Sequence, residues 1–166
     1  RGFFIGEFER NNILYMKKIR IETVVKQMLA DIFTPVSIYL RLRDRFRDTI
    51  LLESTDHHAA DNSYSFIGIN ARAGMEISST SQLEYKLPGQ KPEKMAISQP
   101  ADVPDQLWDF MQRFEMAPAT HRSALFAQGL YGYTTYDAVQ FFDSVQFAGQ
   151  SNGATIPLMR YRLYQY

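Results

Sequence analysis

The chain has 166 residues with 18 basic and 18 acidic side chains, so its formal net charge is zero. This balance removes any general electrostatic reason to bind nucleic acid or an anionic membrane surface. The absence of cysteine excludes disulfide and thiolate chemistry, and a reducing cytoplasm is the simplest expected location. No run approaches the ~20 consecutive apolar residues of a membrane span. The length suits one domain with its own core.

Met16 is followed by two lysines, a pattern typical of the start of a cytoplasmic protein. We therefore expect residues 1–15 to be an upstream or added extension and residues 16–166 to form the domain; a native extension is the alternative. Residues 18–29 alternate loosely and carry Ile19, Ile21, Val24 and Val25. Such β-branched residues predict a strand.

Thr34 and Pro35 form the clearest helix start in the sequence. A threonine side chain can cap free N–H groups, and proline suits the first helical position, where its missing N–H costs nothing. Pro35 also begins an apolar stripe that continues through Tyr39, Leu42 and Phe46. This spacing predicts a helix from about residue 35 to 46.

The rest of the chain is typical of strands separated by Asp, Asn, Ser and Gly turns. An amphipathic helix is predicted over residues 104–115, opened by Asp102 or Val103, and a short helix over Thr135–Phe142. The predicted strands are Thr49–Thr55, Ser63–Asn70, Ala71–Ser78, Gln82–Leu87, Leu125–Tyr133 and Leu158–Tyr164. This order predicts an α+β fold of largely antiparallel β-sheets with a few covering helices.

Common catalytic signatures are missing from the sequence: it has no phosphate-binding glycine loop, no nucleophile elbow and no zinc-protease helix motif. His57 and His58, with Asp56 and Asp61 nearby, could be considered as metal ligands. Adjacent side chains on a strand point to opposite faces, and in a loop their directions are unconstrained. A solvated turn is therefore the favoured interpretation, and no metal site is predicted. His121 is interpreted as a polar residue leading into a strand.

Gly129 and Gly132 stand three residues apart among tyrosines. Glycine in a strand marks a bulge or a close backbone approach, which could serve a ligand or a packed domain. The alternative, favoured by spacing alone, is a strand-to-helix bend in which Asp137 satisfies nearby N–H groups.

Leu51-Leu52-Glu53-Ser54 is typical of an apolar strand that ends in a carboxylate and a hydroxyl. Both groups can accept hydrogen bonds from an amino-acid ammonium. Taken alone, the segment is better interpreted as a strand end that enters solvent.

Five sequence segments, taken together in their order along the chain, change this interpretation of Glu53 and Ser54. They are Thr34-Pro35-Val36-Ser37-Ile38-Tyr39-Leu40, Leu51-Leu52-Glu53-Ser54, Tyr64-Ser65-Phe66-Ile67-Gly68, Gly129-Leu130-Tyr131-Gly132-Tyr133 and Tyr136-Asp137. With these blocks the chain resembles the amino-terminal region of anthranilate synthase component I, from about residue 17 to 143. The related component I of aminodeoxychorismate synthase shares much of the pattern. The fold expected is the amino-terminal part of that family's fold.

The resemblance implies a part of a lyase that converts chorismate and ammonia to anthranilate and pyruvate, the first committed step of tryptophan synthesis, under feedback inhibition by tryptophan. The full enzyme uses magnesium and receives ammonia from a glutamine amidotransferase, component II. Glu53 and Ser54 are expected to hold the ammonium of the inhibitor. The family's Pro-Tyr-Met inhibitor segment and its catalytic and magnesium-binding groups belong to a carboxy-terminal chorismate-binding half that this sequence lacks. The fragment alone is therefore expected to be inactive, with no catalytic or metal residue and no cofactor of its own.

One departure from the family weakens the expected response to tryptophan. Many relatives carry Gly-Arg before the Tyr-Ser-Phe-Ile-Gly run, whereas Asn62 and Ser63 stand here. Two other interpretations stay open: the same region of aminodeoxychorismate synthase, and a free-standing amino-acid-binding module. Cutting a domain away should also leave an apolar seam, so self-association of the chain is expected.

Overall fold

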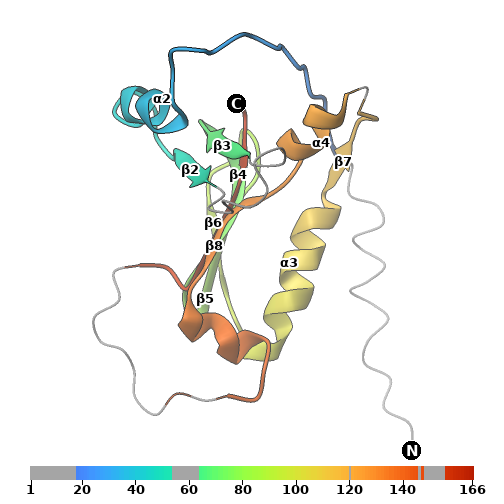
Figure 1. The fold of residues 1–166 in the computed structure, drawn as a ribbon. Helices are drawn as coiled ribbons and strands as arrows, with labels where there is room; N and C mark the ends of the chain where they lie inside the picture. Colours follow the sequence, from blue (N-terminus) through green and yellow to red (C-terminus); the bar gives the residue numbers. More distant parts are fainter. Residues whose placement is uncertain (1–17, 54–63, 120, 146, 148–155) are drawn as a thin grey trace, which may run out of the picture.

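The computed structural model describes residues 18–53, 64–119, 121–145, 147 and 156–166. Its main element is a five-stranded sheet in the order β6-β5-β4-β9-β8, antiparallel throughout. β4 (Ala71–Ser79), β5 (Gln82–Lys86) and β6 (Glu93–Ala96) follow one another as a meander, while β9 (Met159–Tyr164) pairs with β4 and β8 (Tyr131–Thr134) pairs with β9. The predicted α+β class with largely antiparallel sheets is confirmed (Figure 1).

The core lies on one face of this sheet. Alternate side chains of β4 point to that face, and Ala73, Met75 and Ile77 are all buried. α3 (Val103–Gln112) and the 3₁₀ helix η3 (Tyr136–Phe141) pack on them. The short 3₁₀ helix η2 (Pro100–Asp102) leads directly into α3. The buried residues of the cluster are Ala73, Met75, Ile77, Leu83, Leu87, Ile97, Val103, Phe110, Phe114, Ala138, Phe141, Met159 and Leu163.

Two further pairs of strands lie beside the main sheet. β1 (Ile19–Ile21) pairs in parallel with β7 (Phe114–Met116), and β2 (Ile50–Glu53) pairs antiparallel with β3 (Ser65–Gly68). The β2–β3 pair forms a ribbon next to the carboxyl end of β9, where Ile69 N–H donates to the Tyr166 carbonyl at 2.7 Å. Glu53, a predicted site residue, is the last residue of β2 in this ribbon.

The helix start at Thr34 is confirmed. α2 (Pro35–Leu42) begins with a reciprocal capping box: Thr34 Oγ1 accepts from Ser37 N–H at 3.1 Å, and Thr34 N–H donates to Ser37 Oγ at 3.1 Å. The helix ends at Leu42 instead of residue 46. Phe46, predicted to complete the apolar stripe, is 42% exposed.

The predicted strand over residues 18–29 is wrong for most of its length, since only Ile19–Ile21 finds a partner strand. The residues after it run without regular structure across the top of the molecule towards α2 (Figure 1). Val24, Met28 and Leu29 are 94%, 73% and 87% exposed. An extended path spans more distance per residue than a helix would.

The predicted strand Leu125–Tyr133 is also wrong. Its first half is α4 (Arg122–Ala127), and only its second half enters β8. His121, predicted as a polar lead-in to a strand, caps α4: its Nδ1 accepts from Ser123 N–H at 3.2 Å. α3 begins at Val103 and ends at Gln112, so that the residues beyond it are free to form β7. Neither β6 nor β7 was predicted.

The other predicted elements are confirmed, within a few residues, as β2, β3, β4, β5, η3 and β9. The predicted boundary between residues 1–15 and 16–166 lies outside the described residues. Within the described residues, no helix is long and apolar enough to cross a membrane.

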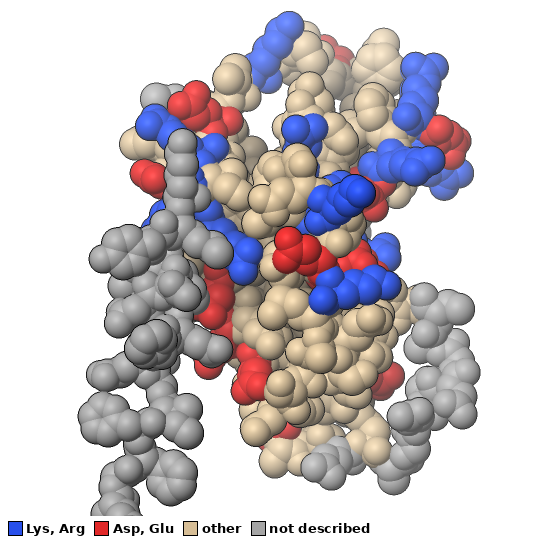
Figure 2. Space-filling view, turned by 180° about the vertical axis from the view of Figure 1, so that it is seen from behind, with Lys and Arg blue, Asp and Glu red and all other residues tan. Residues whose placement is uncertain are grey.

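The face of the sheet opposite the core is polar. Register pairs place Glu76 beside Arg160 and Gly74 beside Arg162. On the side of the molecule shown in Figure 2, basic and acidic side chains lie interspersed, without a large area of one sign. This pattern agrees with the zero net charge of the chain.

Candidate functional site

Glu53 is the last residue of β2 and is exposed. Its register partner is Ser65 of β3, and Leu51 pairs with Ile67. Paired residues of an antiparallel ribbon share a face and alternate along each strand, so Glu53 lies on the face of Leu51 and Ile67. Within the described part of the chain, its carboxylate makes no ion pair. Ser54, the second predicted inhibitor contact, lies outside the described residues, so the structure does not show the two side chains together.

The opposite face of the ribbon is aromatic. Phe66 of β3 stacks on Tyr131 of β8 with ring centroids 5.6 Å apart and an interplanar angle of 28°. Phe126 of α4 lies 5.6 Å from Phe66 and 5.6 Å from Tyr64. Such pairs contribute about 0.5–1.5 kcal/mol each beyond the area they bury. These contacts fix the ribbon on α4 and β8 and therefore fix where Glu53 stands.

Gly68 permits this close packing. A Cβ added there would lie 2.7 Å from the Tyr164 ring and 2.8 Å from Ile50 Cγ2. The last residue of β3 is therefore pressed between β2 and the end of β9. The Tyr-Ser-Phe-Ile-Gly block needs its glycine for this contact.

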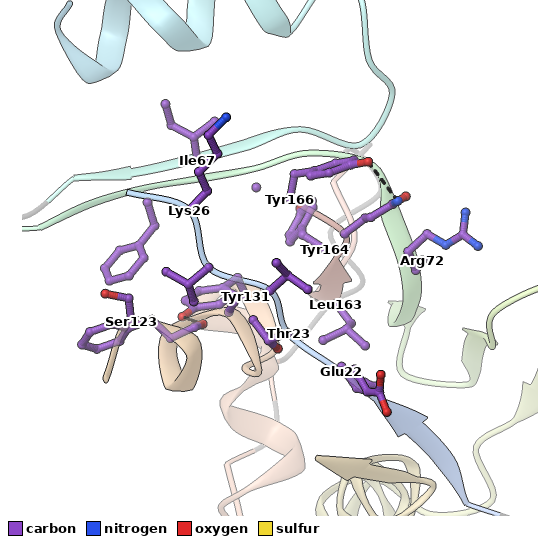
Figure 3. Close-up of a pocket in the computed structure, with 18 of the residues that line it drawn as sticks. Glu22, Thr23, Lys26, Ile67, Arg72, Ser123, Tyr131, Leu163, Tyr164 and Tyr166 are labelled. Atoms are coloured by element: carbon purple, nitrogen blue, oxygen red, sulfur yellow. Dashed lines mark hydrogen bonds between the residues drawn. The ribbon is translucent and has the colours of Figure 1, made fainter. Parts of the chain in front are cut away.

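A cavity of about 940 Å³ lies beneath the same aromatic face. Its walls come from the segment after β1, from β3, from α4 and β8, and from the end of β9 (Figure 3). Figure 3 shows Tyr131, Leu163 and Tyr164 around the space that the Glu22–Lys26 segment crosses. Glu53 is not among the lining residues. Ile67, which shares the face of the ribbon with Glu53, does line the cavity, so the cavity also reaches the edge of that face.

Burial is the cause of two pKa shifts at this cavity. It raises the pKa of the Tyr131 hydroxyl above its usual value of 10.0, and it does the same for Tyr164. The Tyr131 hydroxyl donates to the Phe126 carbonyl. Both tyrosines are neutral hydrogen-bonding groups at neutral pH.

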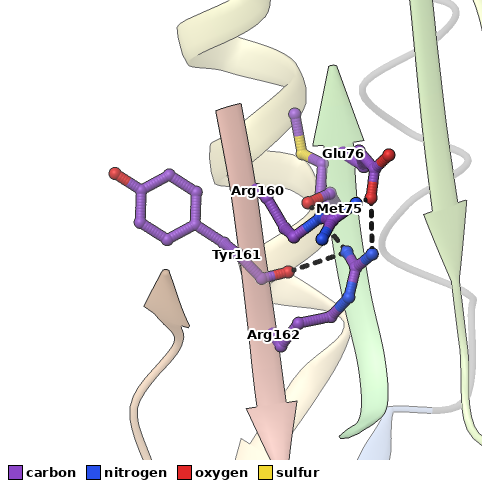
Figure 4. A network of polar contacts seen from close by, with 5 residues as sticks. All are labelled: Met75, Glu76, Arg160, Tyr161 and Arg162. Carbon is purple, nitrogen blue, oxygen red and sulfur yellow. Dashed lines mark hydrogen bonds and ion pairs between the residues drawn. The ribbon is translucent and has the colours of Figure 1, made fainter. Parts of the chain in front are cut away.

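A charged network lies on the open face of the main sheet (Figure 4). Glu76 Oε2 accepts from Arg160 Nε at 2.8 Å and from Arg162 Nη2 at 2.6 Å. Arg162 Nη1 also donates to the Met75 carbonyl at 3.2 Å. Burial acts to raise the pKa of Glu76, but the two arginines outweigh it and hold that pKa below its ordinary value of 4.5. Because both arginines of β9 contact one carboxylate of β4, the network is interpreted as structural support for these two strands.

Gly132 also makes a close approach, which is to protein backbone. A Cβ there would lie 2.7 Å from the Arg160 carbonyl carbon of β9. The chain then turns into η3 as predicted, but the bend is held by Thr135, whose N–H and Oγ1 both donate to the Leu158 carbonyl, at 2.8 and 3.1 Å. Among the described residues, the Asp137 carboxylate accepts no hydrogen bond.

His57, His58, Asp56 and Asp61 lie outside the described residues. Within the part of the chain that the structure describes, no three His, Asp or Glu side chains gather into a group that could hold a metal ion.

Sequence reasoning missed the aromatic face of the ribbon and the cavity below it. One signal was present, because Tyr64, Phe66 and Gly68 alternate on one side of a strand. Their partners, Phe126 and Tyr131, are about sixty residues away in the sequence, and nothing local connects them.

Comparison with known proteins gives one informative similarity. No family model matches the chain, and no solved structure matches it. Anthranilate synthase component 1 of Pseudomonas aeruginosa is 30% identical to it over 117 residues, which are 70% of this chain and 23% of that protein. The chain is similar to a region of an anthranilate synthase component. It spans less than a quarter of the relative it matches, and the match supports the family resemblance drawn from the sequence blocks.

Proposed function

We propose that this chain is the amino-terminal regulatory region of anthranilate synthase component I, the part that senses tryptophan. The observation that carries the proposal is the 30% identity over 117 residues to a protein of that name. The sequence blocks around Thr34, Glu53, Phe66 and Gly132 agree with it. In the structure each of these blocks forms a defined element. They are a capped helix, a strand that ends in a carboxylate, and two strands that need glycine for close packing.

Glu53 is the proposed contact for the tryptophan ammonium, together with Ser54. Glu53 is at the end of a strand, exposed, and on the face of the ribbon opposite the aromatic cluster. A carboxylate in this position can accept a charge-assisted hydrogen bond from an ammonium group. The aromatic cluster behind the ribbon holds its backbone in place, which limits the entropy cost of fixing Glu53 around a ligand.

The reaction proposed for the complete protein converts chorismate and ammonia to anthranilate and pyruvate, with ammonia supplied by a glutamine amidotransferase partner and with magnesium. Among the described residues, no three His, Asp or Glu side chains gather into a group that could hold a metal ion. No role with magnesium is therefore proposed for these residues. Its proposed contribution is regulatory. It binds tryptophan, and this binding inhibits the reaction of chorismate in a chorismate-binding half of the complete protein. The proposed location is the cytoplasm.

The test uses the complete gene product that contains these residues. Anthranilate formation from chorismate, ammonium and magnesium is measured while tryptophan is added. The proposal predicts inhibition by tryptophan, and it predicts that Glu53→Gln raises the half-inhibiting concentration by roughly 10- to 100-fold, since a hydrogen bond to a charged group contributes about 1.5–3 kcal/mol. Glu115→Gln is the matched control, because Glu115 is also an exposed carboxylate on a strand, and it should leave inhibition unchanged.

Three results would contradict the proposal in different ways. Formation of aminodeoxychorismate in place of anthranilate assigns the chain to the related synthase. Activity that tryptophan does not affect removes the sensing role. A gene product with neither activity, which still binds an amino acid, supports a free-standing binding module.

A further inference from the structure

The cavity beneath the β2–β3 ribbon has no part in the proposed tryptophan contact. Glu53 is not among its described lining residues, and Phe66, which is, points to the opposite face of the ribbon. Its volume of about 940 Å³ is within the range of sites for small organic molecules, roughly 300–1,000 Å³. A ligand against the aromatic side of the ribbon is therefore a second ligand of this chain, whether or not the chain senses tryptophan.

The deeper wall of the cavity is aromatic and already ordered. The Phe66 ring contacts those of Phe126 and Tyr131, each with a centroid separation of 5.6 Å, and Leu163, which also lines the cavity, is 6% exposed. The Tyr131 hydroxyl is occupied by its hydrogen bond to the Phe126 carbonyl, so the ring is held in one orientation. A wall of fixed ring faces favours a planar aromatic group, which stacks on it without ordering new side chains.

The described lining of the cavity carries more positive than negative side-chain charge. Lys26, Arg72 and Arg122 line it, and within the described residues none of the three makes an ion pair. Among the described lining residues, the one acidic side chain is that of Glu22, which is 3.2 Å from Arg20 and is compensated by it. The chain as a whole is neutral, so this local excess is a property of the cavity. It favours an anion.

We propose that this cavity binds a planar aromatic anion, such as an aromatic carboxylate, with the ring against Phe66, Phe126 and Tyr131 and the anionic group towards Lys26 and Arg122. Arg72 extends outward in Figure 3 and contributes only to the surrounding potential. A ligand of this class joins the Glu22–Lys26 segment to α4 across the cavity. Its binding should therefore order the segment that links β1 to α2.

The experiment titrates the chain by calorimetry with three naphthalene probes that differ in one group: a carboxylate, a neutral methanol and a methylammonium. The proposal predicts saturable binding of the carboxylate, weaker binding of the alcohol and the weakest binding of the ammonium. Lys26→Gln and Arg122→Gln should each weaken carboxylate binding by roughly two- to fivefold, the range for partly exposed ion pairs. They should leave the alcohol unchanged.

The controls separate this site from the proposed tryptophan contact. Lys94→Gln, on β6 and outside the cavity, and Glu53→Gln should both bind the carboxylate as the unmodified chain does. Phe126→Leu keeps an apolar side chain and removes a ring, and it should weaken both carboxylate and alcohol by about two- to tenfold. Circular dichroism of each variant verifies that the fold is retained.

Absence of saturable binding, or equal binding of all three probes, overturns the proposal. Loss of carboxylate binding in Glu53→Gln but not in the Lys26 and Arg122 variants also overturns it, because the ligand would then occupy the other face of the ribbon. These titrations contain no tryptophan, so they are separate from the test of the proposed tryptophan sensing.

Discussion

Replacing Gly132 by alanine tests whether β8 lies against β9 as the structure shows. A Cβ at this position would be 2.7 Å from the Arg160 carbonyl carbon and 2.8 Å from the Tyr161 Cα, and closer still to the Arg160 carbonyl oxygen. These atoms are backbone of the neighbouring strand, so no side-chain rotation can relieve the contact. The two strands must separate locally.

The size of the effect follows from that separation. Overpacking costs about 1–3 kcal/mol, and each strained or lost ladder hydrogen bond adds about 1 kcal/mol. The lower backbone entropy of alanine in the unfolded chain offsets roughly 0.4–1 kcal/mol. We expect Gly132→Ala to lower the free energy of unfolding by about 3 kcal/mol, which for a chain of this size is a fall in Tm of roughly 6–12 °C.

Urea denaturation followed by circular dichroism measures this change. Gly129→Ala is the matched control from the same block, since its Cβ would meet only the Tyr131 ring, at 3.3 Å. That substitution should cost about 1 kcal/mol or less, because the ring can shift by a few tenths of an ångström. Equal effects of the two substitutions would refute the β8–β9 register, and with it the position of Tyr131 in the cavity wall.

Three further predictions concern the cap, the charged network and the exposed linker. Thr34→Ala removes the oxygen that accepts from the next turn and should lower the free energy of unfolding by about 1 kcal/mol in urea denaturation; no change would contradict the capping box. Glu76 has a folded-state pKa below 4.5, so its stabilising contribution is present above that pH and is lost as pH falls through the folded-state pKa. Thermal melts of Glu76→Gln should therefore depend less on pH between neutral and acidic conditions, and an unchanged dependence would argue against the network. Met28 and Leu29 are 73% and 87% exposed, and we expect the chain to self-associate through them; light scattering should show smaller species when both are serine, and a monomeric unmodified chain at high concentration would contradict this.

Features set by neighbouring residues could be predicted from the sequence. The start of α2 depends on Thr34 and Pro35, and both the cap and the helix are present. The turns between β3, β4 and β5 are equally local, and those strands were placed within a few residues. The last strand, β9, was recognised from its alternating pattern.

Features that depend on contacts between distant residues could not be predicted from the sequence. β1 is short because only three of its residues reach β7, which is about ninety residues away. The run from Leu125 is apolar enough for either a strand or a helix, and its packing partners, Tyr64 and Phe66, are about sixty residues away. The cavity is lined by separate segments from both ends and the middle of the chain, so no local pattern could show it. For Glu53, the apolar run before it predicts a strand end, and only the pairing of β2 with β3 shows which face it occupies.

Direct tryptophan binding to the complete gene product is the measurement that tests the central claim most directly. Calorimetric titration of the unmodified protein and of Glu53→Gln gives two dissociation constants. The account predicts saturable tryptophan binding that the substitution weakens by roughly 10- to 100-fold. Equal dissociation constants, or no tryptophan binding by the unmodified protein, would contradict it.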